Sequence, residues 1–168
     1  MNVSQESHPR AKVLTVSDGV IAGTRQDASG AALASLLAEN GFEVVERRAC
    51  SDGTAPVSEM LEKMAAGFSG LIVTTGGTGF TERDLTPEAT LSVIQREAPG
   101  FAEAMRAVNP LGMLSRGVAG VRDGALILNT PGSPKGSVEM LGAVMKYIPH
   151  ALALMGDPHA DHPGPSAG

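Results

Sequence analysis

Short apolar runs alternate with stretches of helical periodicity along most of this chain. Apolar and β-branched residues fill much of positions 12–17, 42–50, 71–75 and 125–129, and each run ends at small polar residues or glycine. Runs of this length between turn residues are typical of buried strands. The second run is polar in its latter half, so we expect it nearer a sheet edge, and residues 114–121 predict a weaker strand.

Amphipathic stretches separate the predicted strands. The spacing of their apolar residues predicts helices over about 29–40, 57–64, 86–98 and 101–108, and a long helix after Gly136 that Pro149 should bend or restart. Thr86-Pro87 has the form of a helix start, with Thr86 as the cap and Pro87 at the first helical position. Arg122-Asp123-Gly124 predicts a tight turn between two strands.

The alternation of strand and helix patterns predicts an α/β fold. We expect three α/β/α layers around a mainly parallel sheet, in one domain over residues 11–155 with a flexible leader (1–10) and a flexible tail (156–168). In such sheets, ligands collect beyond the carboxyl ends of the strands. The loops after Ser17, Cys50, Thr75 and Asn129 all fall there.

Composition narrows the classes of protein and partner. The 168 residues are 42% hydrophobic, which suits one domain, and the formal net charge of −5 without a run of Lys or Arg argues against nucleic acid as a partner. Cys50 is the only cysteine, and the chain has neither the apolar core of a signal peptide nor an apolar run of membrane-spanning length. We therefore expect a cytoplasmic protein with no membrane association. His159, Asp161 and His162 do not predict a metal site, because an ordered second shell is not expected in a flexible tail.

Two aspartates and a glycine-rich turn follow predicted strands. Residues 76–79 (Gly-Gly-Thr-Gly) leave backbone amides uncovered, and such a turn either holds an anion or is a plain tight connection. Its spacing matches neither a Walker loop nor the dinucleotide fingerprint. Asp84 lies five residues past the last glycine, and Asp52 follows another strand. Each alone suits a turn or helix start, but on one rim of the sheet the two carboxylates could share Mg²⁺, which also takes substrate phosphates as ligands.

Other polar residues of these loops have both a functional and a structural interpretation. Lys135, fixed between proline and glycine, would offset charge on a phosphate leaving group or else be a solvated lysine. Arg116 would bind an anionic group or lie at a strand edge. The same choice holds for Ser17-Asp18 and for the Asp27 to Gly30 region, where helix capping explains Ser29 without a ligand.

Four motifs together resemble the molybdopterin adenylyltransferase family, meaning bacterial Mog and MoaB-type proteins, the plant Cnx G domain and the gephyrin G domain. They are TVSD at 15–18, GGTGFTERDLTPEAT at 76–90, MLSR at 113–116 and ILNTPGSPKG at 127–136. The resemblance covers about residues 11–155. It implies that Mg²⁺-ATP and molybdopterin react to adenylyl-molybdopterin and pyrophosphate. It also implies a homotrimer, and a possible handover of the product to a molybdenum-insertion protein.

The resemblance implies roles for individual residues. Asp84, in ERDLTPE, matches the family's catalytic metal-binding aspartate, and Asp52 matches the second one, although the family's second aspartate commonly follows a proline and Asp52 follows a serine. Nucleotide binding is implied for Gly76, Gly77, Thr78, Gly79, Asn129, Pro131, Gly132, Ser133 and Lys135. Molybdopterin binding is implied for Ser17, Asp18, Asp27, Ser29, Gly30, Ser115 and Arg116.

Three functions are compatible with these motifs. The first is the adenylyltransferase. The second is a non-catalytic MoaB-type trimer that binds molybdopterin or a precursor and passes it on. The third is a domain related to the competence-damage nucleotide hydrolases, but those usually carry an acidic pair directly before Leu-Thr, where this chain has Arg83-Asp84.

Overall fold

A computed structural model describes residues 8–157 and residue 159. Its middle layer is a six-stranded sheet in the order β2-β1-β3-β6-β5-β4. The strands are β1 (Arg10–Val16), β2 (Glu43–Cys50), β3 (Gly70–Thr75), β4 (Arg96–Glu97), β5 (Ala119–Arg122) and β6 (Ala125–Thr130). The first four strands in this order run parallel, and β5 is antiparallel to both β6 and β4. The predicted parallel sheet, with the second strand at its edge, is confirmed.

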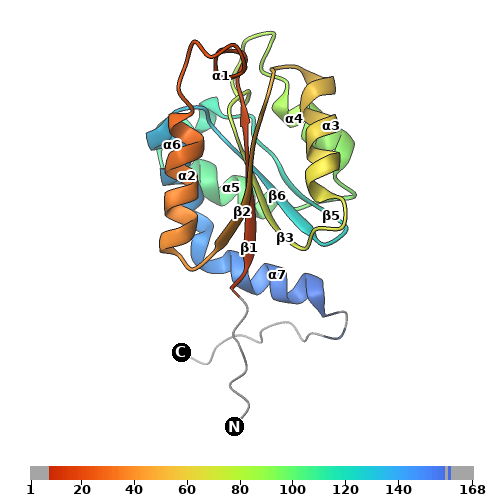
Figure 1. The fold of residues 1–168 in the computed structure, drawn as a ribbon. Helices are drawn as coiled ribbons and strands as arrows, with labels where there is room; N and C mark the ends of the chain where they lie inside the picture. Colours follow the sequence, from red (N-terminus) through yellow and green to blue (C-terminus); the bar gives the residue numbers. More distant parts are fainter. Residues whose placement is uncertain (1–7, 158, 160–168) are drawn as a thin grey trace.

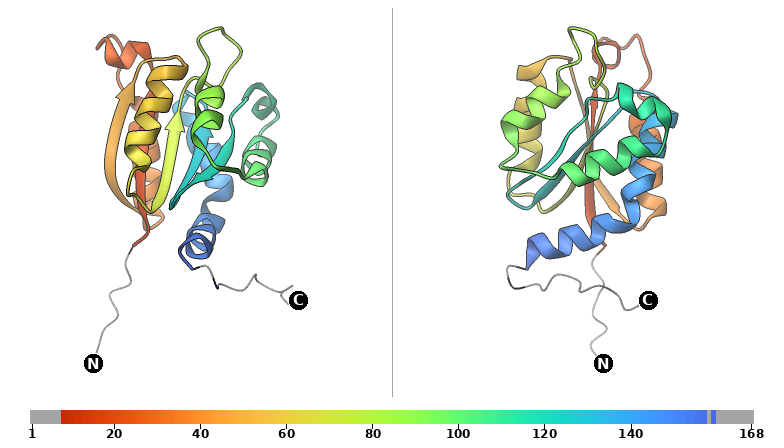
Figure 2. Two further views of the ribbon diagram at one scale, coloured as in Figure 1. Left: turned by 90° about the vertical axis from the view of Figure 1, so that its right-hand side faces the viewer. Right: turned by 180° about the vertical axis from the view of Figure 1, so that it is seen from behind.

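Helices cover both faces of the sheet, which makes the predicted three layers (Figures 1 and 2). The helices are α1 (Asp18–Ile21), α2 (Ala28–Glu39), α3 (Thr54–Ala65), α4 (Thr86–Val93), α5 (Pro99–Ala107), α6 (Pro134–Val144) and α7 (Ile148–Gly156), with short 3-10 helices η1 (Pro110–Leu114) and η2 (Met145–Tyr147). On one face, α2, α5 and α6 bury Val13, Leu71 and Leu128; on the other, α3 and α4 bury Leu14, Ile72 and Ile127. Neighbouring strand residues thus supply two separate cores, as expected of strands buried on both faces.

The C-terminal helical segment has two parts, and a proline begins the second. The long C-terminal helix is interrupted, as predicted: α6 ends at Val144, η2 follows, and α7 restarts with Pro149 in its first turn. α7 passes below the sheet at the end opposite the loops that follow β1, β3 and β6 (Figure 1). Within the described residues, no helix combines the length and apolar character needed to cross a bilayer.

Two predicted elements have bounds that differ from those in the structure. Residues 114–121 are not one strand, because η1 ends at Leu114 and β5 begins only at Ala119. The helix predicted to reach residue 98 ends at Val93, because the backbone N–H groups of Gln95 and Ala98 donate to carbonyls of β5 and draw the chain into β4. Long-range pairing therefore overrides the local pattern in both places.

Thr86 does not cap its helix. Its hydroxyl donates to the carbonyl of Gly76 at 2.9 Å, and Leu85 holds the cap position without a side-chain hydrogen bond. The start of α4 is therefore fastened to the glycine turn.

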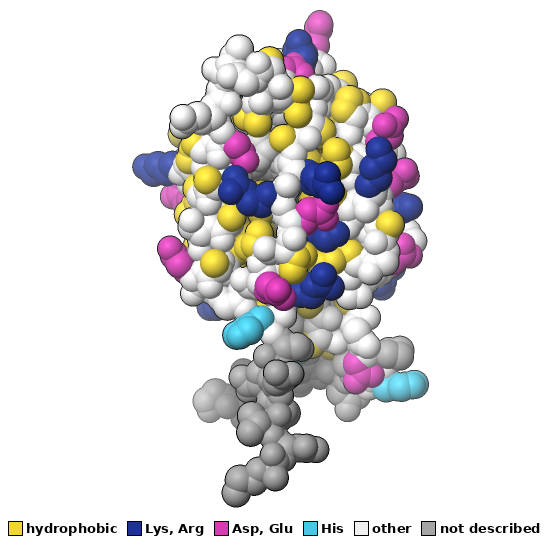
Figure 3. All heavy atoms as spheres, in the orientation of Figure 1, with side chains coloured by type: hydrophobic (Ala, Val, Ile, Leu, Met, Phe, Trp, Pro, Cys, Tyr) yellow, Lys and Arg dark blue, Asp and Glu magenta, His cyan; other side chains and the backbone are white. Residues whose placement is uncertain are grey.

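The edge strand β2 is protected by charge. Glu46 pairs with Lys12 and with Arg48, and Arg47 of the same strand pairs with Asp27 at the start of α2. Figure 3 shows positive and negative side chains interspersed over the middle of the face on which β2 lies in Figure 1. Charged side chains on an exposed edge disfavour pairing with another strand.

The strand order creates a place for a ligand. The chain leaves β1 to form β2 on one side and returns to form β3 on the other side of β1. The loops that follow β1 and β3 therefore part from each other at the carboxyl ends of the strands, which is where ligands bind in open α/β sheets.

Candidate active site

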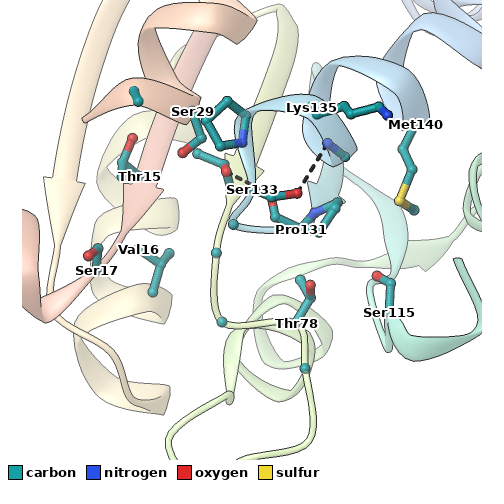
Figure 4. Close-up of a pocket in the computed structure, with 18 of the residues that line it drawn as sticks. Thr15, Val16, Ser17, Ser29, Thr78, Ser115, Pro131, Ser133, Lys135 and Met140 are labelled. Atoms are coloured by element: carbon teal, nitrogen blue, oxygen red, sulfur yellow. Dashed lines mark hydrogen bonds between the residues drawn. The ribbon is translucent and has the colours of Figure 1, made fainter. Parts of the chain in front are cut away.

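A cavity of about 930 Å³ opens at this point, lined by loops that follow β1, β2, β3 and β6 and by η1 and α6. Figure 4 shows Thr15, Val16 and Ser17 of the β1 end on one side, Thr78 and Ser115 on another, and Pro131, Ser133 and Lys135 along a third. The predicted site residues that line it are Ser17, Asp27, Ser29, Asp52, Gly76, Gly77, Thr78, Gly79, Asp84, Ser115, Pro131, Gly132, Ser133 and Lys135. The fold thus gathers four loops that are distant in sequence.

The glycine turn is rigid and presents amides. Gly76 and Gly77 have φ angles of 98° and 67°, a region that L-residues with side chains rarely adopt. Thr86 bonds both carbonyls: its hydroxyl donates to the Gly76 carbonyl at 2.9 Å, and its N–H donates to the Gly77 carbonyl at 3.0 Å. Among the described residues, the N–H groups of Gly77, Thr78 and Gly79 form no hydrogen bond with a backbone carbonyl. Amides fixed in this way suit a phosphate.

The two aspartates predicted from the strand ends line the same cavity. The Asp84 carboxylate accepts from the N–H and the hydroxyl of Thr81, both at 2.9 Å. Asp52 and Asp18 hold each other: the Asp18 N–H donates to Asp52 Oδ2 at 3.0 Å, and the Asp52 N–H donates to Asp18 Oδ1 at 3.2 Å. Asp18 therefore positions Asp52 from behind the cavity wall.

The two carboxylates act on each other. Burial, and then the negative charge of Asp84, raise the pKa of Asp52 above its ordinary value of 3.8. Neither Asp52 nor Asp84 forms an ion pair with a lysine or arginine in the part of the chain that the structure describes. A half-buried pair of repelling carboxylates fits a divalent cation that prefers oxygen ligands.

The described residues offer no group of three or more His, Cys, Asp or Glu side chains that could hold a metal ion. Two carboxylates would leave most of an octahedral Mg²⁺ shell to water and substrate oxygens, which is its usual arrangement in phosphoryl-transfer sites. The residues present therefore fit Mg²⁺ that is held jointly by protein and substrate.

The raised pKa of Asp52 predicts a pH-dependent penalty on folding without divalent cations. In the unfolded chain this carboxyl ionises near its ordinary pKa, whereas in the folded protein its pKa is higher. The free energy of unfolding therefore falls as pH rises from the unfolded pKa to the folded pKa. Above the folded pKa the loss of stability stays constant. Asp52→Asn keeps an acceptor for the Asp18 N–H but removes the charge. With a chelator present, we expect the melting temperature of the variant to be higher than that of the wild type at about pH 7 and equal to it near pH 3. Scanning fluorimetry across pH measures this, and a gain that persisted at pH 3 would contradict it.

The loop after β6 brings a helix N-terminus and a lysine to the cavity. The Pro131 carbonyl accepts from the Thr75 hydroxyl at 2.8 Å, and Ser133 caps α6 by accepting from the Gly136 N–H at 3.1 Å. Lys135, in the first turn of α6, lines the cavity. Positive groups at this helix start favour a phosphate.

Two residues for which the resemblance implied binding roles, Arg116 and Asn129, are bonded to other protein groups and do not line the cavity. Arg116 does not line the cavity: its Nε donates to the Gly79 carbonyl at 2.7 Å, and its other nitrogens bond the Asp84 carbonyl and the Glu88 carboxylate. Asn129 is 2% exposed, and its side-chain amide is satisfied by Val118, Thr74 and Thr90. Their partners show that Arg116 holds the glycine turn and Asp84 in place, and that Asn129 joins β6 to β3 and α4.

Gly30 and Asp27 belong to a helix cap. Gly30 is buried beside Thr15, and its N–H donates to the Asp27 carboxylate at 3.0 Å. Asp27 also accepts from the Thr15 hydroxyl and pairs with Arg47. Asp27, and not Ser29, is thus the cap of α2, which leaves the Ser29 side chain for the cavity wall.

Several lining residues escaped the sequence analysis. Arg25 and Gln26 come from the loop between α1 and α2, Asn109 and Leu111 from η1 and its cap, and Glu139 and Met140 from the second turn of α6. The last two lie one turn past Lys135, so the helical period alone could have placed them near the cavity. Arg25 adds a second basic side chain to the lining that includes Lys135.

Comparison with known proteins finds relatives that match most of the chain. A family model described as a probable molybdopterin binding domain matches residues 12–150. The molybdopterin adenylyltransferase of Helicobacter pylori J99 is 40% identical over 150 residues, 85% of each chain, and that of Escherichia coli K12 is 36% identical over 172 residues, 90% of this chain and 88% of the other. The crystal structure of the molybdopterin biosynthesis enzyme MoaB from Thermus thermophilus is 46% identical, with a TM-score of 0.83 over 90% of this chain and 99% of that one.

Proposed function

Because this chain belongs to the family of probable molybdopterin binding domains, we propose that it is a molybdopterin adenylyltransferase of molybdenum cofactor biosynthesis. Its substrates are Mg²⁺-ATP and molybdopterin, and its products are adenylyl-molybdopterin and pyrophosphate. The relatives that bear this enzyme name match most of the chain at 36–40% identity, which supports the assignment.

The observation that carries the proposal is the common cavity of the two aspartates, the glycine turn and the start of α6. A volume of about 930 Å³ lies at the upper end of the usual range for ligand pockets, as two substrates require. Asp52 and Asp84 supply the negative charge that attracts a cation, whereas the amides of residues 77–79 and the side chains of Lys135 and Arg25 suit anions.

The reaction joins two anions. An oxygen of the terminal phosphate of molybdopterin bonds to the α-phosphorus of ATP, and the bond from that phosphorus to the β-bridging oxygen breaks, so pyrophosphate leaves with the electron pair. Asp52 and Asp84 would hold Mg²⁺, which would supply positive charge to offset that of the phosphates. The glycine amides orient the phosphates, and Lys135 balances charge on the leaving pyrophosphate. No general base is needed, because a phosphate monoester is already ionised at neutral pH.

The decisive experiment mixes the purified protein with molybdopterin, ATP and Mg²⁺. We expect stoichiometric pyrophosphate and adenylyl-molybdopterin, detected by a coupled assay and by mass spectrometry. A non-catalytic member of the family would bind molybdopterin in calorimetry and release no pyrophosphate. That result would show that the protein is a binding protein of the same pathway and not an adenylyltransferase.

We propose a cytoplasmic homotrimer that hands its product to a molybdenum-insertion protein. Large apolar side chains are exposed on and beside η1, where Leu111 is 71% and Met113 73% exposed, and such a patch suits a protein interface. Light scattering on the purified protein should give three times the mass of the 168-residue chain. A monomeric mass would rule the trimer out.

A further inference from the structure

Glu139 is an acidic residue in the wall of a cavity proposed to hold phosphates. It lies on the second turn of α6 and lines the cavity together with Met140, which is 5% exposed. A carboxylate repels a phosphate unless a cation stands between them, and Asp52 and Asp84 are the pair suited to that. Among the parts of a substrate in this cavity, Glu139 therefore suits one that is not anionic.

Asn109 fixes the Glu139 carboxylate. The Asn109 side-chain N–H donates to Glu139 Oε2 at 3.2 Å, while the Leu111 N–H donates to Asn109 Oδ1 at 2.9 Å. The second of these bonds sets the orientation of the amide, so its donor side points at Glu139. Asn109, in the loop between α5 and η1, thus holds a carboxylate of α6 in one position.

The remaining acceptor capacity of Glu139 has no protein partner. Within residues 8–157 and 159, no donor bonds to Oε1, and no lysine or arginine pairs with this side chain. A carboxylate has two oxygens and about four lone-pair sites, so it can accept from two adjacent N–H groups at once. Leu111, Leu114 and Met140 contribute apolar atoms to the lining of the same cavity.

We propose that Glu139 reads the pyrimidine edge of the pterin ring of molybdopterin. The pyrimidine ring of the pterin is planar and has a 2-amino-4-oxo edge, which presents the N3–H and a hydrogen of the 2-amino group side by side. The two oxygens of Glu139 accept these two hydrogens. The faces of the ring pack against Leu111 and Leu114 of η1 and Met140 of α6. Glu139 is then a specificity-determining residue, and this role rests on the proposed function.

The proposed contact differs from a merely structural one. If Glu139 served only to tie α6 to η1, glutamine would serve as well, because its carbonyl oxygen also accepts from Asn109. Toward the pterin edge, however, glutamine has only one acceptor oxygen. Its NH₂ group, a donor, would face one of the two N–H donors of the ring, so one hydrogen bond would be lost. A bidentate contact discriminates between matched and mismatched edges by about tenfold or more.

The test compares two small fluorescent probes, pterin and lumazine, in which a 2-oxo group replaces the 2-amino group. Fluorescence titration should show that the wild type binds pterin at least about tenfold more tightly than lumazine. Glu139→Gln should lose or invert this preference, because glutamine matches the N3–H and 2-oxo pair of lumazine. Glu103→Gln, an exposed position on α5, is the matched control and should keep the wild-type ratio.

Each outcome decides something. An unchanged ratio in Glu139→Gln, or equal binding of both probes by the wild type, would overturn the assignment of Glu139 and leave the adenylyltransferase intact. A wild type that discriminates between the probes but releases no pyrophosphate would instead refute the enzyme and keep the assignment. Asn109→Ala removes the amide that fixes the carboxylate, so it should weaken pterin binding while keeping the order of preference.

Discussion

Asp84→Asn should lower the rate of pyrophosphate release by about 10²- to 10³-fold at saturating substrates, the usual effect of removing one charge-stabilising group from an active site. The change is nearly isosteric, and the amide oxygen can still accept from Thr81, whose N–H and hydroxyl both bond the carboxylate at 2.9 Å. The fold should therefore be kept while half of the charge that attracts Mg²⁺ is lost. A steady-state coupled assay, with melting temperatures to show folding, measures both.

A metal titration separates the role of Asp84 in binding from a general effect on the site. In manganese-binding measurements without nucleotide, Asp84→Asn and Asp52→Asn should each weaken the binding of Mn²⁺ used as a probe for Mg²⁺, because two carboxylates share the ion. Asp123→Asn, in the turn between β5 and β6, is the matched control and should change neither rate nor affinity. Wild-type activity in Asp84→Asn would show that Asp84 has no role in the reaction.

The architecture followed from the sequence because periodicity and chain order report on it directly. Buried strands at 12–17, 71–75 and 125–129, separated by amphipathic stretches, allow few arrangements other than a parallel sheet covered by helices. The carboxyl ends of parallel strands share one rim, so the positions of Asp52 and Asp84 after two predicted strands gave the condition under which their carboxylates could share a cation. Both aspartates line one cavity, and the charge of Asp84 acts on Asp52.

What the sequence could not reveal depends on side chains that meet across long loops. Arg116 and Asp84 are 32 positions apart, and only the fold shows that the guanidinium grips the backbone of Asp84 and Gly79. A motif marks Arg116 as noteworthy without saying whether it faces the ligand or the protein. β4 was missed for the same reason: two residues with no strand pattern of their own pair with Val121 and Gly120.

The glycine turn leads to the second large effect. Gly77→Ala should destabilise the protein by about 2–4 kcal/mol, because alanine is strained at a φ of 67° and its methyl group would overlap the Thr86 hydroxyl. That hydroxyl cannot move freely, since Thr86 is fully buried and bonds the Gly76 carbonyl at 2.9 Å. For a chain of this length we expect a fall in Tm of about 4–16 °C, measured by calorimetry.

A second glycine supplies the control that makes this prediction specific. Gly142 lies inside α6, where an added methyl group would meet no atom within 4 Å. Gly142→Ala should therefore raise stability by about 0.5–1 kcal/mol through helix propensity alone. Opposite signs for the same chemical change would show that residue 77 is glycine because of its backbone angle and the buried threonine behind it. If both variants melted together, the turn would be adaptable, and its amides would not be held in advance for a phosphate.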